Sequence, residues 1–175
     1  MKHRLTSWRS RRMRLGTVCL FAASFYSAPT LATPASGFTA VQQWKGLYPP
    51  INLNTPTDRR SDKDDKWNAK LMTKDNSDIY VTRNSIAVGG QSGWHSHPGP
   101  SLITVTVGTI KAYESTDPAC SPTTYHTGEG FVDYGDHAHL IRNESGAAAE
   151  TVAVQFLPTG ATRRIDQPEP TNCKF

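Results

Sequence analysis

A series of short β-branched and apolar segments, separated by Gly, Pro and Asp turns, constrains the fold of this 175-residue chain more than any other feature. The segments recur through residues 67–157, and no stretch between them shows the apolar period of an amphipathic helix. They lie at 79–81, 86–88, 102–107, 109–114, 130–133, 137–143 and 151–157. Short strands at such regular spacing predict an all-β sandwich or barrel. The length and the 37% apolar content suit a single domain with its own core.

The positive charge of the chain is concentrated at its start. The formal net charge is +4, but six of the 19 Lys and Arg residues lie within the first 14 residues, which contain no Asp or Glu. An apolar run follows at 15–28, too short to span a bilayer as a helix, and small residues flank Leu31 after it. We interpret residues 1–32 as a signal peptide that is cleaved after Ala32; the alternative is a disordered basic arm.

Removal of residues 1–32 changes the charge balance. The remaining chain has 13 basic and 15 acidic residues, a net charge of −2. No later segment combines a basic run with aromatic side chains, so we expect no nucleic-acid partner. The sequence predicts an exported protein, periplasmic or secreted, whose mature form is not associated with a membrane.

Two cysteines, Cys120 and Cys173, follow the signal segment. In an exported chain of this size a cysteine pair favours one disulfide, which here would tie the C-terminal tail to the barrel. Neither cysteine is close in sequence to the histidines described below. We therefore favour a structural role for the pair over a metal-binding or redox role.

The mature chain divides into three zones. Residues 33–66 contain few periodic patterns and many turn formers, and we interpret them as an extended N-terminal arm, with a short helix at 38–44 as an option. Residues 67–157 form the barrel, and the Pro-rich tail 158–175 lies over its surface. The arm could exchange with a second copy, so a homodimer is compatible with the sequence.

Histidines carry the strongest chemical signal. Two pairs share the pattern His-x-His, His95 with His97 and His137 with His139. On a strand, residues i and i+2 project from the same face, so each pair could chelate one ion. Two such pairs on neighbouring strands could supply three or four imidazole ligands to a divalent metal ion.

The spacing around these histidines resembles the two motifs of the cupin superfamily, G-x5-H-x-H-x3,4-E-x6-G and G-x5-P-x-G-x2-H-x3-N. The matching residues are Gly89, His95, His97 and Gly108 for the first motif, and Gly128, His139 and Asn143 for the second. The resemblance implies a single-domain, antiparallel jelly-roll β-barrel. It also implies that His95, His97 and His139 are the metal ligands.

The chain departs from the cupin motifs at three positions. Ser101 stands where the first motif usually has a glutamate ligand, and a hydroxyl cannot replace a carboxylate as a charged ligand. Tyr134 and Asp136 replace the Pro and Gly of the second motif, which alters a turn rather than the ligand set. Similar three-histidine cupins include cysteine dioxygenase and the enzymes that cleave β-diketones or gentisate, all of which use ferrous iron. The resemblance therefore favours iron(II), while zinc, manganese, nickel and copper stay open.

The expected site also suggests its ligand and its other side chains. Three neutral imidazoles leave the +2 charge of the ion uncompensated, which favours an anionic, bidentate small molecule. Simple alternation of side chains along a strand places His137 on the same face as His139. His137 could then be a fourth ligand, a base behind the ligands, or a histidine at the barrel mouth without a role in the site. Three carboxylates are candidate general bases or merely solvated groups: Glu114, Asp133 and Asp136. Four aromatic residues are candidate pocket walls or plain core: Trp94, Tyr113, Phe131 and Tyr134.

The sequence is compatible with three functions. The leading hypothesis is a small-molecule enzyme, an iron-dependent, dioxygenase-like oxidoreductase. The second is a non-catalytic cupin that binds a metal or a small ligand, and the third is a structural barrel whose histidines bind no metal. No Ser-His-Asp order, phosphate loop or CxxC motif supports a hydrolase, a kinase or a thioredoxin-like protein.

Overall fold

The computed structural model describes residues 32–55 and 69–175. Every secondary-structure element within these ranges is a β-strand. The twelve described strands are β1 (Ser36–Tyr48), β2 (Asn52–Thr55), β3 (Ala69–Met72), β4 (Ser77–Gln91), β5 (His95–Ser96), β6 (Ser101–Val107), β7 (Thr109–Glu114), β8 (Thr123–His126), β9 (Gly130–Asp133), β10 (His139–Arg142), β11 (Ala149–Pro158) and β12 (Ile165–Asp166). Within these ranges no helix is long and apolar enough to cross a membrane. The predicted signal peptide before Ala32 and the predicted boundary at 66–67 lie outside the described residues.

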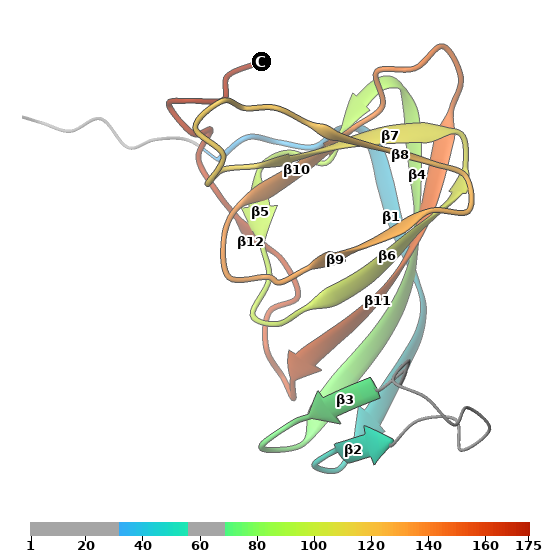
Figure 1. Ribbon diagram of the computed structural model, residues 1–175, viewed down its shortest axis with the longest axis vertical. Helices are drawn as coiled ribbons and strands as arrows, with labels where there is room; N and C mark the ends of the chain where they lie inside the picture. The colour runs from blue at the N-terminus through green and yellow to red at the C-terminus, as the bar shows by residue number, and fades with distance from the viewer. Residues whose placement is uncertain (1–31, 56–68) are drawn as a thin grey trace, which may run out of the picture.

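The strands pair antiparallel and curl into an almost closed barrel (Figure 1). One half has the order β1-β4-β11-β6-β9, and the other has the order β12-β5-β10-β7-β8. The halves join where Gln91, at the end of β4, pairs with Arg142 of β10. β2 and β3 form a separate two-stranded sheet at the lower end in Figure 1. The predicted all-β, antiparallel jelly-roll barrel is confirmed.

The strands that build the barrel wall show the expected period of two. β11 buries every second residue from Ala149 to Leu157, and β6 buries Ser101, Ile103 and Val105. Successive side chains of a strand point to opposite faces, so polar residues at the same phase also point inward. Ser101 on β6 and Gln155 on β11 are buried in this way beside the apolar residues.

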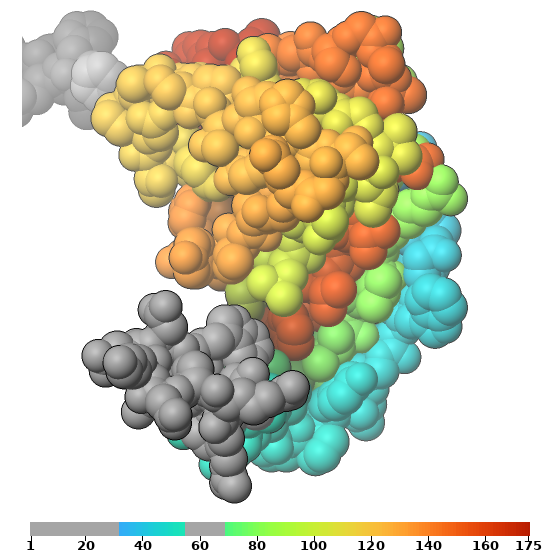
Figure 2. Space-filling model, turned by 45° about the vertical axis from the view of Figure 1, so that its right-hand side comes forward, coloured from blue at the N-terminus to red at the C-terminus, as the bar shows by residue number. Residues whose placement is uncertain are grey.

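Residues 38–44 belong to a strand, so the helix considered for them is wrong. They lie in β1, which pairs with β4 from Ser36 opposite Gln91 to Tyr48 opposite Ser77. Figure 2 shows β1 at the outer side of the sheet, next to β4, followed by β11 and β6. Most side chains of β1 are exposed on both faces, so its sequence lacks the alternation that reveals a strand. Pairing with β4 sets its conformation instead.

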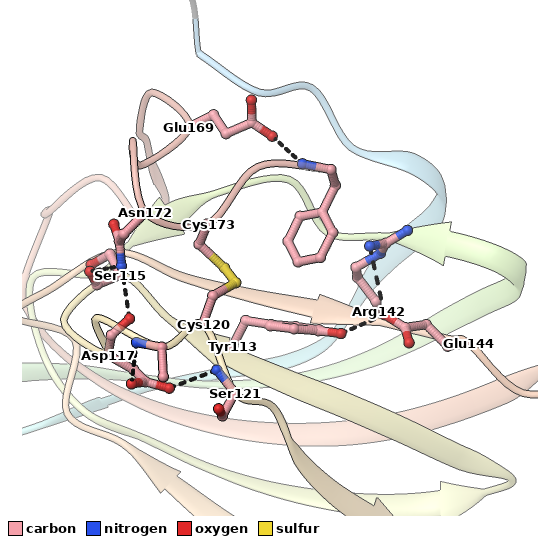
Figure 3. The surroundings of a disulfide bond; sticks show 12 residues. Tyr113, Ser115, Asp117, Cys120, Ser121, Arg142, Glu144, Glu169, Asn172 and Cys173 are labelled. Carbon is pink, nitrogen blue, oxygen red and sulfur yellow. Dashed lines mark hydrogen bonds and ion pairs between the residues drawn. A yellow bond between two sulfur atoms is a disulfide. The ribbon is translucent and has the colours of Figure 1, made fainter.

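Two apolar clusters stabilise the barrel. The first fills its interior and consists of Ile86, Ile103, Val105, Ile110, Ile141, Ala149 and Ala153. The second lies beneath the C-terminal tail and consists of Trp94, Tyr113, Leu140 and Cys173. The Cys120–Cys173 disulfide joins this second cluster to the loop after β7, as predicted (Figure 3). The tail also places the ring of Phe175 at 4.8 Å, centroid to centroid, from that of Tyr113.

Candidate metal centre

Three of the four paired histidines converge in the barrel. His95 begins β5, His97 follows the end of that strand, and His139 begins β10. β5 and β10 pair directly, with His95 opposite His139. The strand register therefore brings together two histidines, His95 and His139, that are more than forty residues apart in the sequence.

The three imidazoles are close enough to share one ion. Their ring centroids lie 4.3 Å apart for His95 and His139, 4.9 Å for His95 and His97, and 5.2 Å for His97 and His139. One ring nitrogen of each lies within 4.8 Å of those of the other two. His95 and His139 are only 6% and 3% exposed, and the side chain of His97 is 8% exposed. We call these three residues the histidine cluster.

Backbone carbonyls fix the orientation of two of the rings. Nδ1 of His95 donates to the carbonyl of Gly93 at 2.8 Å, and Nδ1 of His97 donates to the carbonyl of Arg163 at 2.5 Å. In a neutral imidazole this leaves the lone pair on Nε2. Histidines that ligate metals are commonly held in this way through their second nitrogen.

Burial keeps the cluster unprotonated at neutral pH. Burial, together with the neighbouring charge of His139, lowers the pKa of His95 to about 2. Burial also lowers the pKa of His139 to about 4, although the carboxylate of Asp133 acts in the opposite direction. The pKa of His97 is lowered too, again mainly by burial. All three rings therefore present lone pairs, which a metal ion requires of histidine ligands.

Two buried oxygens beside the cluster support the fit to a cation. Among the described residues, Oδ2 of Asp133 and Oγ of Ser101 have no hydrogen-bond partner. Oδ2 of Asp133 lies 3.7 Å from Nε2 of His97, and Oδ1 lies 3.4 Å from Nδ1 of His139. Buried polar atoms without partners are costly and uncommon in folded proteins. A metal ion would satisfy such oxygen and nitrogen atoms together, so the residues present fit one.

A cavity of about 70 Å³ opens onto the histidine cluster. Its apolar wall consists of Phe38, Ala40, Ile103, Ile141 and Ala153, and its neutral polar wall of Thr82, Asn84, Ser92, Ser101 and Gln155. Arg163 and Arg164, from the C-terminal tail, complete the lining. Sites for drug-sized ligands occupy roughly 300–1,000 Å³, so this cavity suits a few waters or a compact small molecule.

His137 does not join the cluster. The predicted alternation of side chains does not extend to His137, because β10 starts at His139 and His137 lies in the bend before the strand. Its Nε2 lies 2.8 Å from Oε2 of Glu114, and its Nδ1 lies 2.6 Å from Oδ1 of Asp136. Burial lowers the pKa of His137, but the hydrogen bond to Asp136 and the charge of Glu114 outweigh it, and the pKa is raised overall. With both nitrogens facing carboxylates, His137 is not the fourth ligand that the sequence left open.

The three candidate carboxylates have different surroundings. Asp133 is buried beside the cluster, whereas Glu114 and Asp136 face His137. Burial raises the pKa of Glu114, although the neighbouring His137 opposes this shift. Of the three, only Asp133 is in reach of the cluster in the described structure.

The four candidate wall aromatics lie outside the cavity lining. Trp94 and Tyr113 belong to the cluster under the tail, Phe131 stacks on Tyr125, and Tyr134 is 69% exposed. The alternative interpretation, plain core, fits Trp94, Tyr113 and Phe131, whereas Tyr134 lies at the surface and fits neither interpretation.

Two groups of cavity residues were not predicted from the sequence. Phe38 reaches the cavity from β1, within the segment 33–66 for which the sequence predicts an extended arm. Arg163 and Arg164 reach it from the tail. The one signal for them in the sequence is that two arginines are adjacent in a Pro-rich segment. No motif spacing connects these segments to the histidines.

Comparisons with known proteins were made on both sequence and structure. No family model and no curated protein matches the sequence. Among solved structures, the chain is similar to the polyketide cyclase RemF from Streptomyces resistomycificus, with 13% identity, a TM-score of 0.49, and 89% of this chain and 91% of that chain covered.

The chain is also similar to two further solved structures. One is the cupin domain of an XRE-family transcriptional regulator from Enterobacter cloacae, with 15% identity, a TM-score of 0.43, and 70% of this chain and 99% of that chain covered. The other is an oxalate oxidase, with 22% identity, a TM-score of 0.43, and 50% of this chain and 45% of that chain covered. At these identities no activity is transferred. The described residues form an antiparallel barrel that brings His95, His97 and His139 together, which is the arrangement that the resemblance to the cupin superfamily predicts.

Proposed function

We propose that the histidine cluster binds one divalent metal ion and that the protein acts on a small molecule in the adjoining cavity. The observation that carries this proposal is the convergence of three buried, unprotonated imidazoles, with one nitrogen of each within 4.8 Å of the others. His95, His97 and His139 would hold the ion. Three protein ligands leave coordination positions open for water or for a substrate.

The cavity lining supports a compact, anionic ligand. Arg163 and Arg164 supply positive charge at the site, and the three imidazoles are neutral. Arg164 is paired with Asp166, whereas Nε of Arg163 donates to the neutral amide of Gln155 at 3.1 Å. The charge of Arg163 therefore stays available to attract an anion into a buried, low-dielectric space.

The reaction that we propose is an iron(II)-dependent oxidation of the dioxygenase type. The metal ion would supply the redox chemistry and a point of attachment for a chelating substrate. Arg163 would bind and orient the anionic group, and the apolar wall that includes Phe38 and Ile103 would exclude bulk water. Gln155 would keep the side chain of Arg163 in place through its hydrogen bond.

A second candidate is a non-catalytic binding protein that uses the same metal and cavity. The arginines that would hold an anion, Arg163 and Arg164, would serve a binding protein as well as an enzyme. Export through residues 1–32 and formation of a homodimer stay predictions.

Metal content and oxygen uptake test the proposal. The mature protein is purified both anaerobically and in air, and its bound metal is determined by mass spectrometry. We expect close to one equivalent; less than about a tenth of an equivalent would refute both candidate functions. Oxygen uptake by the iron(II) form is then measured with thiols, diketones and hydroxylated aromatic acids. Uptake with one class supports the enzyme, and binding without uptake supports the second candidate.

A further inference from the structure

The cross-strand neighbour of Ser101 is a buried carboxylate. Ser101 on β6 pairs directly with Asp133 on β9, and both side chains point into the barrel, at 1% and 4% exposure. Directly opposed residues of antiparallel strands have Cβ atoms about 4.5–5.5 Å apart. The carboxylate that is missing from the first histidine motif is therefore present one strand to the side.

The two oxygens of Asp133 have different environments. Oδ1 accepts a hydrogen bond from the backbone N–H of Gly135 at 2.8 Å. Oδ2 is buried, has no hydrogen-bond partner among the described residues, and lies 3.7 Å from Nε2 of His97. One oxygen thus holds the turn after β9, and the other faces the histidine cluster.

The contact between Asp133 and His97 suits a shared metal ion. Nδ1 of His97 donates to the carbonyl of Arg163, so its Nε2 is an acceptor. Oδ2 of Asp133 faces this acceptor and has no hydrogen-bond partner among the described residues, so a metal ion between the two atoms would satisfy both. Metal–nitrogen and metal–oxygen bonds are each about 2.1 Å long, so one ion can contact both atoms at a separation of 3.7 Å. Asp133 does not belong to the group whose ligand atoms all lie within 4.8 Å of one another, so its side chain would turn toward the ion on binding.

From this geometry we propose that Asp133 is the fourth protein ligand and replaces, from the neighbouring strand, the glutamate that Ser101 lacks. This inference rests on the metal site proposed above. It assigns the site a net charge of +1 with a divalent ion, in place of the +2 of three histidines alone. The remaining positive charge and that of Arg163 still favour an anionic ligand.

Titration of the metal-free protein with Co²⁺ alone tests the proposal. Four proteins are compared by dissociation constant and by visible absorption: the wild type, Asp133→Asn, the double variant Asp133→Ser with Ser101→Glu, and the control Asp136→Asn. Asn keeps the acceptor for Gly135 and removes the charge. Asp136 faces His137 and is exposed, so Asp136→Asn should bind as the wild type does.

We expect Asp133→Asn to weaken Co²⁺ binding about 10- to 100-fold and to shift its absorption bands. The double variant should regain most of the affinity, because it returns a carboxylate to the cross-strand position. If Asp133→Asn binds Co²⁺ with the affinity and the absorption spectrum of the wild type, the inference is overturned, and the three histidines alone form the site. A double variant as weak as Asp133→Asn would overturn it as well, because Asp133 would then act by holding the turn or His139.

Infrared difference spectra of the wild type need no variant and cover the case in which Asp133→Asn does not fold. Addition of Co²⁺ should shift a carboxylate stretching band, and the absence of any carboxylate shift would overturn the inference. If the wild type binds neither Co²⁺, Zn²⁺ nor anaerobic Fe²⁺, the proposed function itself fails together with this inference.

Discussion

The two His-x-His segments look alike in the sequence and behave differently in the structure. His95 and His97 both turn into the barrel, whereas only His139 of the second pair does so. His137 lies outside the strand and faces Glu114 and Asp136. The first pair is buried with its lone pairs free, and His137 is held between carboxylates.

The difference comes from the contacts of the two histidines that lie outside the strands. His97, one residue after β5, donates to the carbonyl of Arg163, whereas His137, in the bend before β10, faces Glu114 and Asp136. Trp94 and Leu140, the sequence neighbours of His95 and His139, point away from the histidine cluster and pack under the C-terminal tail. A short histidine motif therefore predicts a ligand only when the contacts of both histidines are known.

The largest expected effect separates the two members of the second pair. His139→Ala removes one of three proposed ligands, and we expect metal content below about a tenth of an equivalent. His137→Ala, two residues away, should keep the wild-type content because His137 is outside the cluster. Inductively coupled plasma mass spectrometry of both variants measures this. Equal metal loss in the two would show that the pair acts as a unit and that the comparison is wrong.

The next effect concerns the support behind the first pair. Cys173 packs with Trp94 and Leu140, the sequence neighbours of His95 and His139, and its disulfide closes a separation of 53 residues. We expect Cys173→Ser to lower the free energy of unfolding by about 4 kcal/mol, chiefly because the unfolded chain gains freedom. Urea unfolding of the variant and of the reduced wild type should agree. A loss below about 1 kcal/mol would mean that the tail is held by packing alone.

The smallest expected effect is on the pH dependence of the free energy of unfolding, to which His139 and His137 should contribute with opposite signs. The pKa of His139 is about 4 in the fold against an ordinary value of about 6.5, so its contribution to stability is complete above pH 6.5 and is lost as the pH falls toward 4. The free energy of unfolding of the metal-free protein should therefore fall as the pH is lowered through this range. His139→Gln should flatten this part of the profile.

His137 should act in the opposite direction. Its pKa is raised in the fold, so its contribution is present below pH 6.5 and is lost as the pH rises through the folded value. His137→Gln should therefore destabilise the protein more at pH 5.5 than at pH 8. Thermal unfolding across this range compares the two variants, and slopes of the same sign would contradict the assignment of His137 to the carboxylates.

Motif spacing predicted the converging histidines, and the period of two predicted the barrel walls. Two features were beyond the sequence for physical reasons. β1 exposes most of its side chains and shows no period, so its strand conformation depends on pairing with β4. The approach of Asp133 to His97 depends on the register of β6 with β9, which no local pattern encodes. Arg163 and Arg164 reach the cavity through the path of the tail, which is equally non-local.

A crystal structure of the metal-loaded protein, with anomalous data at the absorption edge of the metal, tests the central claim most directly. The claim predicts one strong anomalous peak about 2.1 Å from an imidazole nitrogen of each of His95, His97 and His139. The peak should not be in contact with His137. A peak held by His137 with Glu114 or Asp136, or a loaded protein without a peak at the histidine cluster, would contradict it.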